Sequence, residues 1–206
     1  MADEAGRLKL RPAGPDDAAA IAAIYAPFVE GSMISFELEP PDAAAMRDRI
    51  AAGGALYPWL AAEEEDEILG FAYASAFRPR PAYRYAVETT VYVRQDCHGR
   101  GIGGFLYRPL LATLEAQGFA HAFAAISLPN PASVAIHERH GFSHAGTYRQ
   151  VGFKHDGWWD VGLWQRMLAP MTVPPIEPRP WAETGCLAGH SASPFPSHCG
   201  EGPATN

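Results

Sequence analysis

Apolar and polar positions follow two periodic patterns along this chain. Between residues 15 and 30 apolar side chains recur every three or four positions, which predicts an amphipathic helix. Residues 59–62 and 68–74 are short apolar runs joined by an acidic link, which is typical of paired strands. The same reading predicts strands at 8–12, 59–62, 68–74, 86–93, 122–128, 145–153 and 158–168, and helices at 15–30, 41–52, 101–117 and 130–140.

Glycines mark the ends of several of these elements. Gly53-Gly54, Gly118 and Gly141 each follow a predicted helix, where a residue without a Cβ closes the last turn most easily. Gly157 is expected in the turn between the last two strands, and the acidic link 63–67 in a solvated hairpin turn. Residues 33–36 fit either a loop or a short extended piece.

The order of the elements indicates the fold class. Helices and strands are both present, but they do not alternate regularly as in a doubly wound parallel sheet. We therefore expect an α+β domain, or mixed α/β in three layers, over residues 8–168. Residues 1–7 are expected to be a flexible N-terminus. Residues 169–206, rich in proline, glycine and serine, are expected to be a largely extended or disordered tail whose first part, up to about Trp181, packs on the domain.

Composition and charge narrow the classes of protein. The 206 residues are 48% apolar, enough for a sizeable core, and the net charge of −7 argues against a nucleic-acid partner. There is no long apolar run and no signal-peptide pattern at the N-terminus, so no membrane partner is expected. The odd number of cysteines, Cys97, Cys186 and Cys199, fits a reducing cytoplasm.

The stretch from Val91 to Tyr107 carries the clearest chemistry. A β-branched and aromatic run is followed by a polar turn, by glycines and by an apolar-periodic segment, which together predict a strand, a glycine-rich turn and a helix. Backbone N–H groups at such a helix N-terminus form an anion site, most often for phosphate. A dinucleotide fold would need a different glycine spacing, and a P-loop would need Gly-Lys-Ser/Thr. A plain structural turn is the alternative.

This stretch resembles the pyrophosphate loop of the GNAT acyltransferase superfamily, whose motif is Gln/Arg-x-x-Gly-x-Gly/Ala. Here the motif reads from His98 to Gly103, with His in place of the first Gln or Arg. The flanks agree as well: residues 91–93 before the loop, residues 105–107 after it, and residues 130–133 and 137–142 downstream.

A closer resemblance covers roughly residues 8–180. The chain looks like the phosphinothricin N-acetyltransferase branch, which includes enzymes acting on methionine sulfone and methionine sulfoximine. The matching pieces are Ser35-Phe36, Glu39-Pro40, 57–60, 82–83, 87–93, 114–119, 128–131 and 152–162. The resemblance implies the GNAT fold, with a mixed, mostly antiparallel central sheet flanked by helices. It also implies acetyl-CoA as co-substrate and a homodimer.

Two residues are candidates for the catalytic chemistry. Glu88 lies in the middle of a predicted strand, where acidic residues are disfavoured, so a functional role would explain its presence. The alternative explanation is that its side chain faces solvent. The resemblance implies that Glu88 is the base that takes a proton from the substrate ammonium. It also places His137 where most GNAT enzymes have a Tyr that donates to the departing thiolate. The alternative is that His137 has no catalytic role and either caps a helix or packs in the core.

The resemblance also implies the residues around the co-substrate. The backbone of Val91, Tyr92 and Val93 would pair with the pantetheine arm like an added strand, and Asn130, itself a plausible helix N-cap, would hydrogen-bond it. The resemblance also places the Arg94 side chain near the charge of the pyrophosphate. The alternative is that Arg94 is an ordinary surface arginine exposed to solvent. The pyrophosphate cradle would comprise His98, Gly99, Arg100, Gly101, Ile102, Gly103 and Gly104.

Cationic and aromatic residues are expected around an amino-acid substrate that carries a carboxylate and phosphinate or sulfone oxygens. Arg78, Arg80, Tyr83 and Arg84 lie in one basic and aromatic loop, and Arg pairs well with such groups. Phe36 and Tyr92 are expected to wall the apolar part. The branch has Lys-x-Arg where this chain has Arg78-Pro79-Arg80, which leaves the exact substrate open.

No metal site is expected. Gly141 breaks the helix between His140 and His144, so these side chains and His137 need not converge. The cysteines and histidines of the tail lack the tight paired spacing of a zinc site.

Three functions remain open at this point. The leading one is transfer of acetyl to the α-amine of a small amino acid of the phosphinothricin, methionine sulfoximine or methionine sulfone type, by direct attack in a ternary complex. Cys97 is interpreted as incidental rather than as a covalent acyl carrier. The alternatives are a protein or peptide N-acetyltransferase and a non-catalytic acyl-CoA-binding protein.

Overall fold

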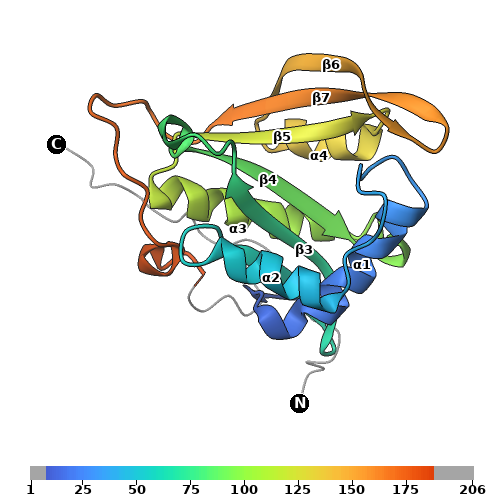
Figure 1. Cartoon of the computed structure of the whole chain (residues 1–206). Helices are drawn as coiled ribbons and strands as arrows, with labels where there is room; N and C mark the ends of the chain where they lie inside the picture. Colours follow the sequence, from blue (N-terminus) through green and yellow to red (C-terminus); the bar gives the residue numbers. More distant parts are fainter. Residues whose placement is uncertain (1–7, 188–206) are drawn as a thin grey trace.

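A computed structural model describes residues 8–187 as helices packed on both faces of a seven-stranded sheet (Figure 1). The sheet order is β1-β2-β3-β4-β5-β7-β6. Its strands are β1 (Lys9–Pro12), β2 (Trp59–Glu64), β3 (Glu67–Ala76), β4 (Ala86–Val93), β5 (His121–Leu128), β6 (Ser143–Lys154) and β7 (Gly157–Met167). The helices are α1 (Ala18–Glu30), α2 (Ala43–Gly53), α3 (Ile102–Gln117) and α4 (Pro131–Arg139), with short 3-10 turns η1 (Pro15–Asp17), η2 (Pro81–Tyr83), η3 (Gln95–Cys97) and η4 (Trp181–Thr184).

The sheet separates two apolar cores. On one face α1 and α2 contribute Ile21, Val29 and Met46, which pack with Trp59 and Phe71 of the sheet. On the other face the long helix α3 packs its leucines against alternate residues of β3, β4 and β5, and α4 lies on the same side (Figure 1). The expected α+β class with a mixed, mostly antiparallel sheet is therefore confirmed.

The predicted elements are all present, but several boundaries move. The hairpin turn between β2 and β3 is formed by Glu65 and Asp66 alone, because both adopt positive φ and the strands continue up to them. The prediction that Gly157 forms the last turn is wrong, since His155 and Asp156 make the turn with positive φ and Gly157 begins β7. Residues 33–36 form a loop rather than an extended piece.

The pairing of β4 with β5 is short and parallel. Only Ala86, Val87 and Glu88 are in register with β5, whereas β4 pairs with β3 from Val87 to Val93. Beyond Glu88 the pairing of the two strands ends, whereas β5 stays in register with β7, on its other edge, from His121 to Leu128. The β5-facing edge of β4 from Thr89 to Val93 therefore has backbone groups outside the ladder of the described sheet.

The segment after β7 packs against the domain as far as it is described. The Arg179 amide donates to the Gln117 carbonyl at the end of α3, and the Trp181 amide donates to the Ala55 carbonyl after α2. Glu177 accepts hydrogen bonds from Arg84 and from the Tyr85 hydroxyl. The expectations for residues 1–7 and for the tail beyond residue 187 fall outside the described part of the chain. Among residues 8–187 no helix is long and apolar enough to cross a membrane.

We predict that Gln117 is a buried clasp for this segment. The side chain is 1% exposed, and its Nε2 donates at 2.8 Å to both the Leu56 and the Arg179 carbonyl oxygens. Gln117→Met leaves both carbonyl oxygens without this donor, so we expect the free energy of unfolding to fall by about 1 kcal/mol in urea denaturation. The same change at the exposed Gln95 should leave it unaltered. Equal stability of the two variants would contradict the clasp.

Candidate active site

The glycine-rich turn leads directly from β4 into α3. Gly99 and Gly101 adopt φ of +80° and +79°, the left-handed region that residues with a Cβ avoid. At Gly103 a Cβ would lie 2.8 Å from the Ile136 side chain, so only glycine lets α3 approach α4 this closely. No side chain caps the start of α3, which leaves its first backbone N–H groups, from Ile102 onward, as donors for an anion.

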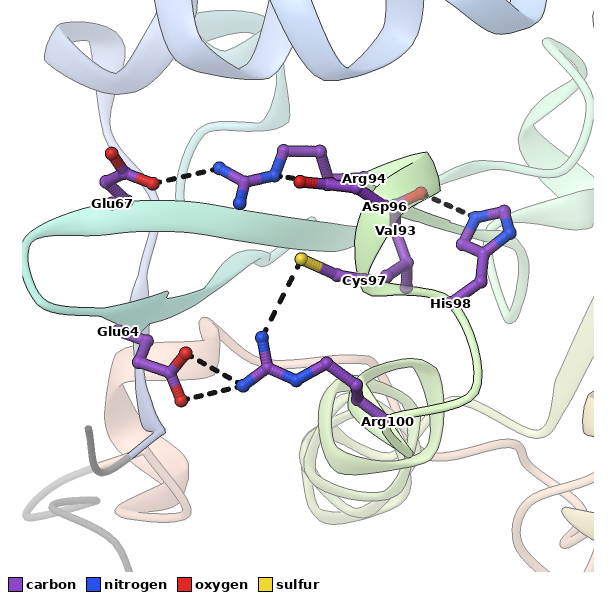
Figure 2. A network of polar contacts seen from close by, with 8 residues as sticks. All are labelled: Glu64, Glu67, Val93, Arg94, Asp96, Cys97, His98 and Arg100. Atoms are coloured by element: carbon purple, nitrogen blue, oxygen red, sulfur yellow. Dashed lines mark hydrogen bonds and ion pairs between the residues drawn. The ribbon is translucent and has the colours of Figure 1, made fainter.

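The arginines of this turn are directed at carboxylates (Figure 2). Arg94 donates to Asp96 at 2.7 Å and to Glu67 at 3.0 Å. Arg100 donates to both oxygens of Glu64 at 2.7 and 2.8 Å. The five side chains together carry a net negative charge. In this structure the positive character of the turn therefore comes from the backbone of α3, not from its arginines.

His98, the residue that departs from the family motif, is held by the end of strand β4. Its Nε2 donates to the Val93 carbonyl at 2.9 Å (Figure 2), and its ring lies parallel to Phe28 at 6.2 Å between centroids. The side chain thus bridges the end of β4 and helix α1.

Strand β4 presents different chemistry on its two faces, as the alternation predicts. Thr89 points toward α3, where its Oγ1 lies 2.6 Å from the Tyr107 hydroxyl in the apolar core. Tyr92 lies on the opposite face, against Tyr25 of α1 at 4.9 Å between ring centroids. Glu88 shares the face of Tyr92 and lies where β5 begins to diverge from β4.

Glu88 is partly shielded and has a cationic neighbour. Its side chain is 33% exposed, and its Oε2 lies 3.6 Å from Nη1 of Arg78. Burial raises the pKa of Glu88, and the positive charge of Arg78 opposes that shift. A carboxylate of raised pKa in a partly dry site has the properties of a general base.

The loop between β3 and β4 holds Arg78 in place through stacked aromatic rings. Phe77 stacks on Phe123 of β5 at 4.1 Å, Tyr83 meets Phe77 edge-on at 5.7 Å, and the Arg78 guanidinium lies 4.4 Å above the Phe77 ring. Arg80 is exposed in the same loop. The expectation that Arg84 faces a substrate is not supported, because its guanidinium pairs with Glu177.

A cavity of about 380 Å³ opens between α2 and the strands β2 and β3. Its walls are mostly aromatic, and its polar groups come from Arg49, Ser75 and the tyrosines. Glu88 is not one of the lining residues, but its register partner across the β3–β4 ladder, Ser75, is. The lining residues are Tyr25, Met46, Arg49, Ala52, Gly53, Tyr57, Trp59, Phe71, Tyr73, Ala74, Ser75, Ala76 and Tyr92.

Among these residues the sequence points only to Tyr92 as a site residue. Tyr73 could have been found, because it follows Phe71 by two positions and so shares its face of the strand. Burial raises the pKa of the Tyr73 hydroxyl, so it stays protonated. Arg49 gave no signal in the sequence, since the rotation of α2 relative to the sheet decides which of its exposed side chains reaches the cavity.

Phe36 lies outside the cavity, against the β6–β7 hairpin. A Cβ added to Gly152 would lie 2.1 Å from the Phe36 ring, which shows how closely the ring covers that glycine. The structure therefore does not bring Phe36 together with Tyr92 in one continuous wall of this cavity.

Asn130 and His137 lie on the α3 side of the sheet. Asn130 caps α4, its Oδ1 accepting from the Ser133 amide at 3.1 Å, as its position predicts. His137 is 4% exposed, and its Nδ1 donates to the Ser133 carbonyl at 2.7 Å. Its Nε2 is buried without a hydrogen-bond partner.

The protonation of His137 follows from this environment. Burial lowers the pKa of His137, so the ring is neutral near pH 7. With the proton on Nδ1, the neutral ring has a lone pair at Nε2. It can accept a hydrogen bond there, and it can donate one only when doubly protonated.

Metal chemistry has no visible site in residues 8–187, where no three His, Cys, Asp or Glu side chains are grouped for an ion. Cys97 and Cys186 are buried free thiols. Cys199 lies outside the described residues.

Comparison with known proteins agrees with this geometry. The profile of the Acetyltransferase (GNAT) family matches residues 21–142. The phosphinothricin N-acetyltransferase of Streptomyces viridochromogenes is 41% identical over 180 residues, 87% of this chain and 98% of the relative. The L-methionine sulfoximine/L-methionine sulfone acetyltransferase of Pseudomonas paraeruginosa is 37% identical over 170 residues, 81% of this chain and 98% of the relative.

Solved structures give the same result. The GNAT superfamily phosphinothricin acetyltransferase of Sinorhizobium meliloti, determined in complex with AcCoA, aligns with a TM-score of 0.78 at 36% identity, over 84% of this chain and 93% of that one. The fold, the glycine turn before α3 and these relatives lead to one assignment: the chain belongs to the GNAT family and is an N-acetyltransferase.

Proposed function

We propose that this enzyme transfers acetyl from acetyl-CoA to the α-amine of a small amino acid of the phosphinothricin, methionine sulfoximine or methionine sulfone type, directly in a ternary complex. The observation that carries the proposal is the position of Glu88. It lies where β4 and β5 diverge, at the start of the free edge of β4, and its register partner Ser75 lines the aromatic cavity, so we expect one carboxylate to lie close to both reactants.

The residues present fit acetyl-CoA, which supplies an activated acetyl group as a thioester. The free edge of β4 at Val91–Val93 offers backbone partners to an extended amide-bearing arm. The N–H groups that begin α3, behind Gly99 and Gly101, suit a pyrophosphate. The Oδ1 of Asn130 caps α4, so its side-chain amide nitrogen is the group that would donate a hydrogen bond to the pantetheine arm.

Glu88 prepares the amine. An amino acid carries an ammonium group near pH 7, and the nitrogen has no lone pair until one proton leaves. The Glu88 carboxylate accepts that proton, and its raised pKa makes it a stronger base than an exposed Glu. Arg78, 3.6 Å from Glu88, and Arg80 are proposed to bind the anionic groups of the substrate, with Tyr83 and Tyr92 as apolar walls.

His137 is proposed to contact the departing sulfur through Nε2. As the C–S bond breaks, the sulfur takes the proton that the attacking nitrogen must lose, and the neutral ring then accepts a hydrogen bond from this thiol at Nε2 while Nδ1 stays on the Ser133 carbonyl. The role implied by the family Tyr, donation to a thiolate, requires a doubly protonated ring, which burial disfavours.

Glu88→Gln tests the proposed base while preserving shape. We expect kcat/KM for the amino acid to fall by roughly 10²- to 10⁴-fold, because an amide cannot take the proton. The Kd of acetyl-CoA, measured by calorimetry, should not change. The wild-type enzyme is assayed first on a panel of amino acids by thiol release. Equal turnover by the variant would refute the base, and a panel without any substrate would refute the small-molecule function.

The pH dependence of kcat/KM should report on Arg78. Activity is lost as pH falls through the pKa of Glu88, because the carboxylate must be ionised. Arg78 stabilises the carboxylate, so Arg78→Ala raises the pKa of Glu88 further and should shift the acidic limb to higher pH. Arg149→Ala, an exposed change on β6, should leave the limb in place. If the acidic limb of the Arg78→Ala variant stayed in place or moved to lower pH, Arg78 would not stabilise the Glu88 carboxylate.

We also propose a homodimer formed through the β6–β7 edge of the sheet. Exposed apolar side chains gather on this hairpin, with Val151, Phe153 and Trp158 between 54% and 61% exposed. Trp158→Glu should convert dimers to monomers in sedimentation analysis. Val173→Glu, at a 99% exposed apolar side chain elsewhere, should not. A wild-type monomer at assay concentrations would end this proposal.

A further inference from the structure

Lys154, at the end of β6, is a cation in an unusual place. The residue is 5% exposed, and its Nζ donates to the Val29 carbonyl at 2.5 Å and to the Ser35 carbonyl at 2.7 Å. Both acceptors belong to the end of α1 and the loop that follows it. Lys9 and Lys154 are the lysines of a chain whose other basic residues are arginines. The compact ammonium of Lys154 thus lies at a buried position where two backbone oxygens converge.

The same loop is fixed at two further points. The Ser127 hydroxyl on β5 donates to the Ile34 carbonyl at 2.9 Å. Arg49 on α2 forms two hydrogen bonds to Glu37 at 2.7 and 2.8 Å, and the Tyr25 hydroxyl donates to the same carboxylate. Tyr25 and Arg49 also line the cavity. The loop thus joins the cavity wall to the β6–β7 hairpin.

Phe36 lies between two of these fixed residues. The Ser35 carbonyl is bound by Lys154, and the Glu37 carboxylate is bound by Arg49. The Phe36 ring covers Gly152, two positions before Lys154 on the same strand. One short segment of β6 therefore supports both the backbone beside Phe36 and the ring itself.

We infer that Lys154 is a positioning residue for substrate specificity. It holds the loop 32–37, whose Ser35 and Glu37 side chains bind Tyr25 and Arg49 of the cavity wall, so that Phe36 borders the amino-acid site from outside the cavity. This inference rests on the proposed function for the substrate that Phe36 would contact. Lys154 itself touches no reacting group; it acts through the Ser35 carbonyl and Phe36. Burial lowers the pKa of Lys154, and the nearby Glu37 charge opposes that shift, consistent with an ammonium retained by its two acceptors.

Lys154→Met keeps the length of the side chain and removes the donors. We expect the KM for the amino acid to rise roughly tenfold, which corresponds to about 1.4 kcal/mol, with kcat at saturation and the KM for acetyl-CoA nearly unchanged. The matched control is Lys9→Met, an exposed change on β1, which should alter neither KM. An unchanged amino-acid KM, or an equal rise in both KM values, would overturn the role.

A double-mutant cycle separates positioning from general loss of stability. If Lys154 acts through Phe36, Phe36→Ala should raise the amino-acid KM in the wild type but add little in Lys154→Met. Additive effects would show that the two residues act independently and would overturn the inference. Lys154→Arg, which retains a cation able to reach carbonyl oxygens, should restore part of the lost affinity; no restoration counts against the role.

A measurement on the unaltered protein is independent of both folding of the variants and enzyme activity. Reductive methylation followed by mass spectrometry should modify Lys9 readily and spare Lys154. Rapid labelling of Lys154 would overturn the placement. If Lys154 is protected but the wild-type enzyme acetylates no amino acid of the panel, the proposed substrate class fails. If the panel gives a substrate and Lys154→Met leaves its KM unaltered, the inference alone fails.

Discussion

The short parallel pairing between β4 and β5 is the constraint on which the rest of the site depends. Three residues of each strand are in register, after which β5 stays with β7 and β4 stays with β3. A continuous ladder would satisfy the backbone of Val91–Val93 and leave no edge for an extended ligand. Because the strands diverge at Glu88, the same point in the sheet offers a free strand edge, a carboxylate and the approach to the start of α3.

Charge is distributed in an unexpected way around this point. The glycine turn contains two arginines, but Arg94 and Arg100 are neutralised by Glu64, Glu67 and Asp96 (Figure 2). The attraction for an anion is therefore supplied by backbone N–H groups that are fixed by the fold and need no side-chain rearrangement. Arg78 lies on the Phe77 ring, which stacks on Phe123, and its carboxylate neighbour at 3.6 Å is Glu88 itself.

Burial shifts the ionisable groups of the site toward their neutral forms. It raises the pKa of Glu88 and lowers those of His137 and Lys154. The consequences differ with the partners each group has. Glu88 keeps a cationic neighbour and remains a usable base, whereas His137 donates to a backbone carbonyl and has only a lone pair left at Nε2. Lys154 is surrounded by acceptors, which makes it a structural donor rather than a reactive amine.

The sequence by itself determined the elements, the family and the alternation of β4. Apolar periodicity, together with prolines and glycines at element ends, located the four α-helices and seven strands of residues 8–187, and the glycine spacing from Gly99 to Gly104 located the turn before α3, because these signals depend on local geometry. The same local signals wrongly predicted Gly157 in the last turn. His155 and Asp156 form that turn with positive φ, because Gly157 is already paired with Lys154 in the hairpin.

Only the tertiary structure decided which side chains meet. Arg84 was grouped with Arg78 because they share a loop, yet Glu177, more than ninety residues later, binds it. Packing of α2 and β3 brings Arg49 and Tyr73 into the cavity wall. Packing of β6 against the α1–α2 loop brings Lys154 to the Ser35 carbonyl. Such contacts join residues far apart in the chain, and the angle at which elements pack sets them. No local pattern of residues encodes that angle.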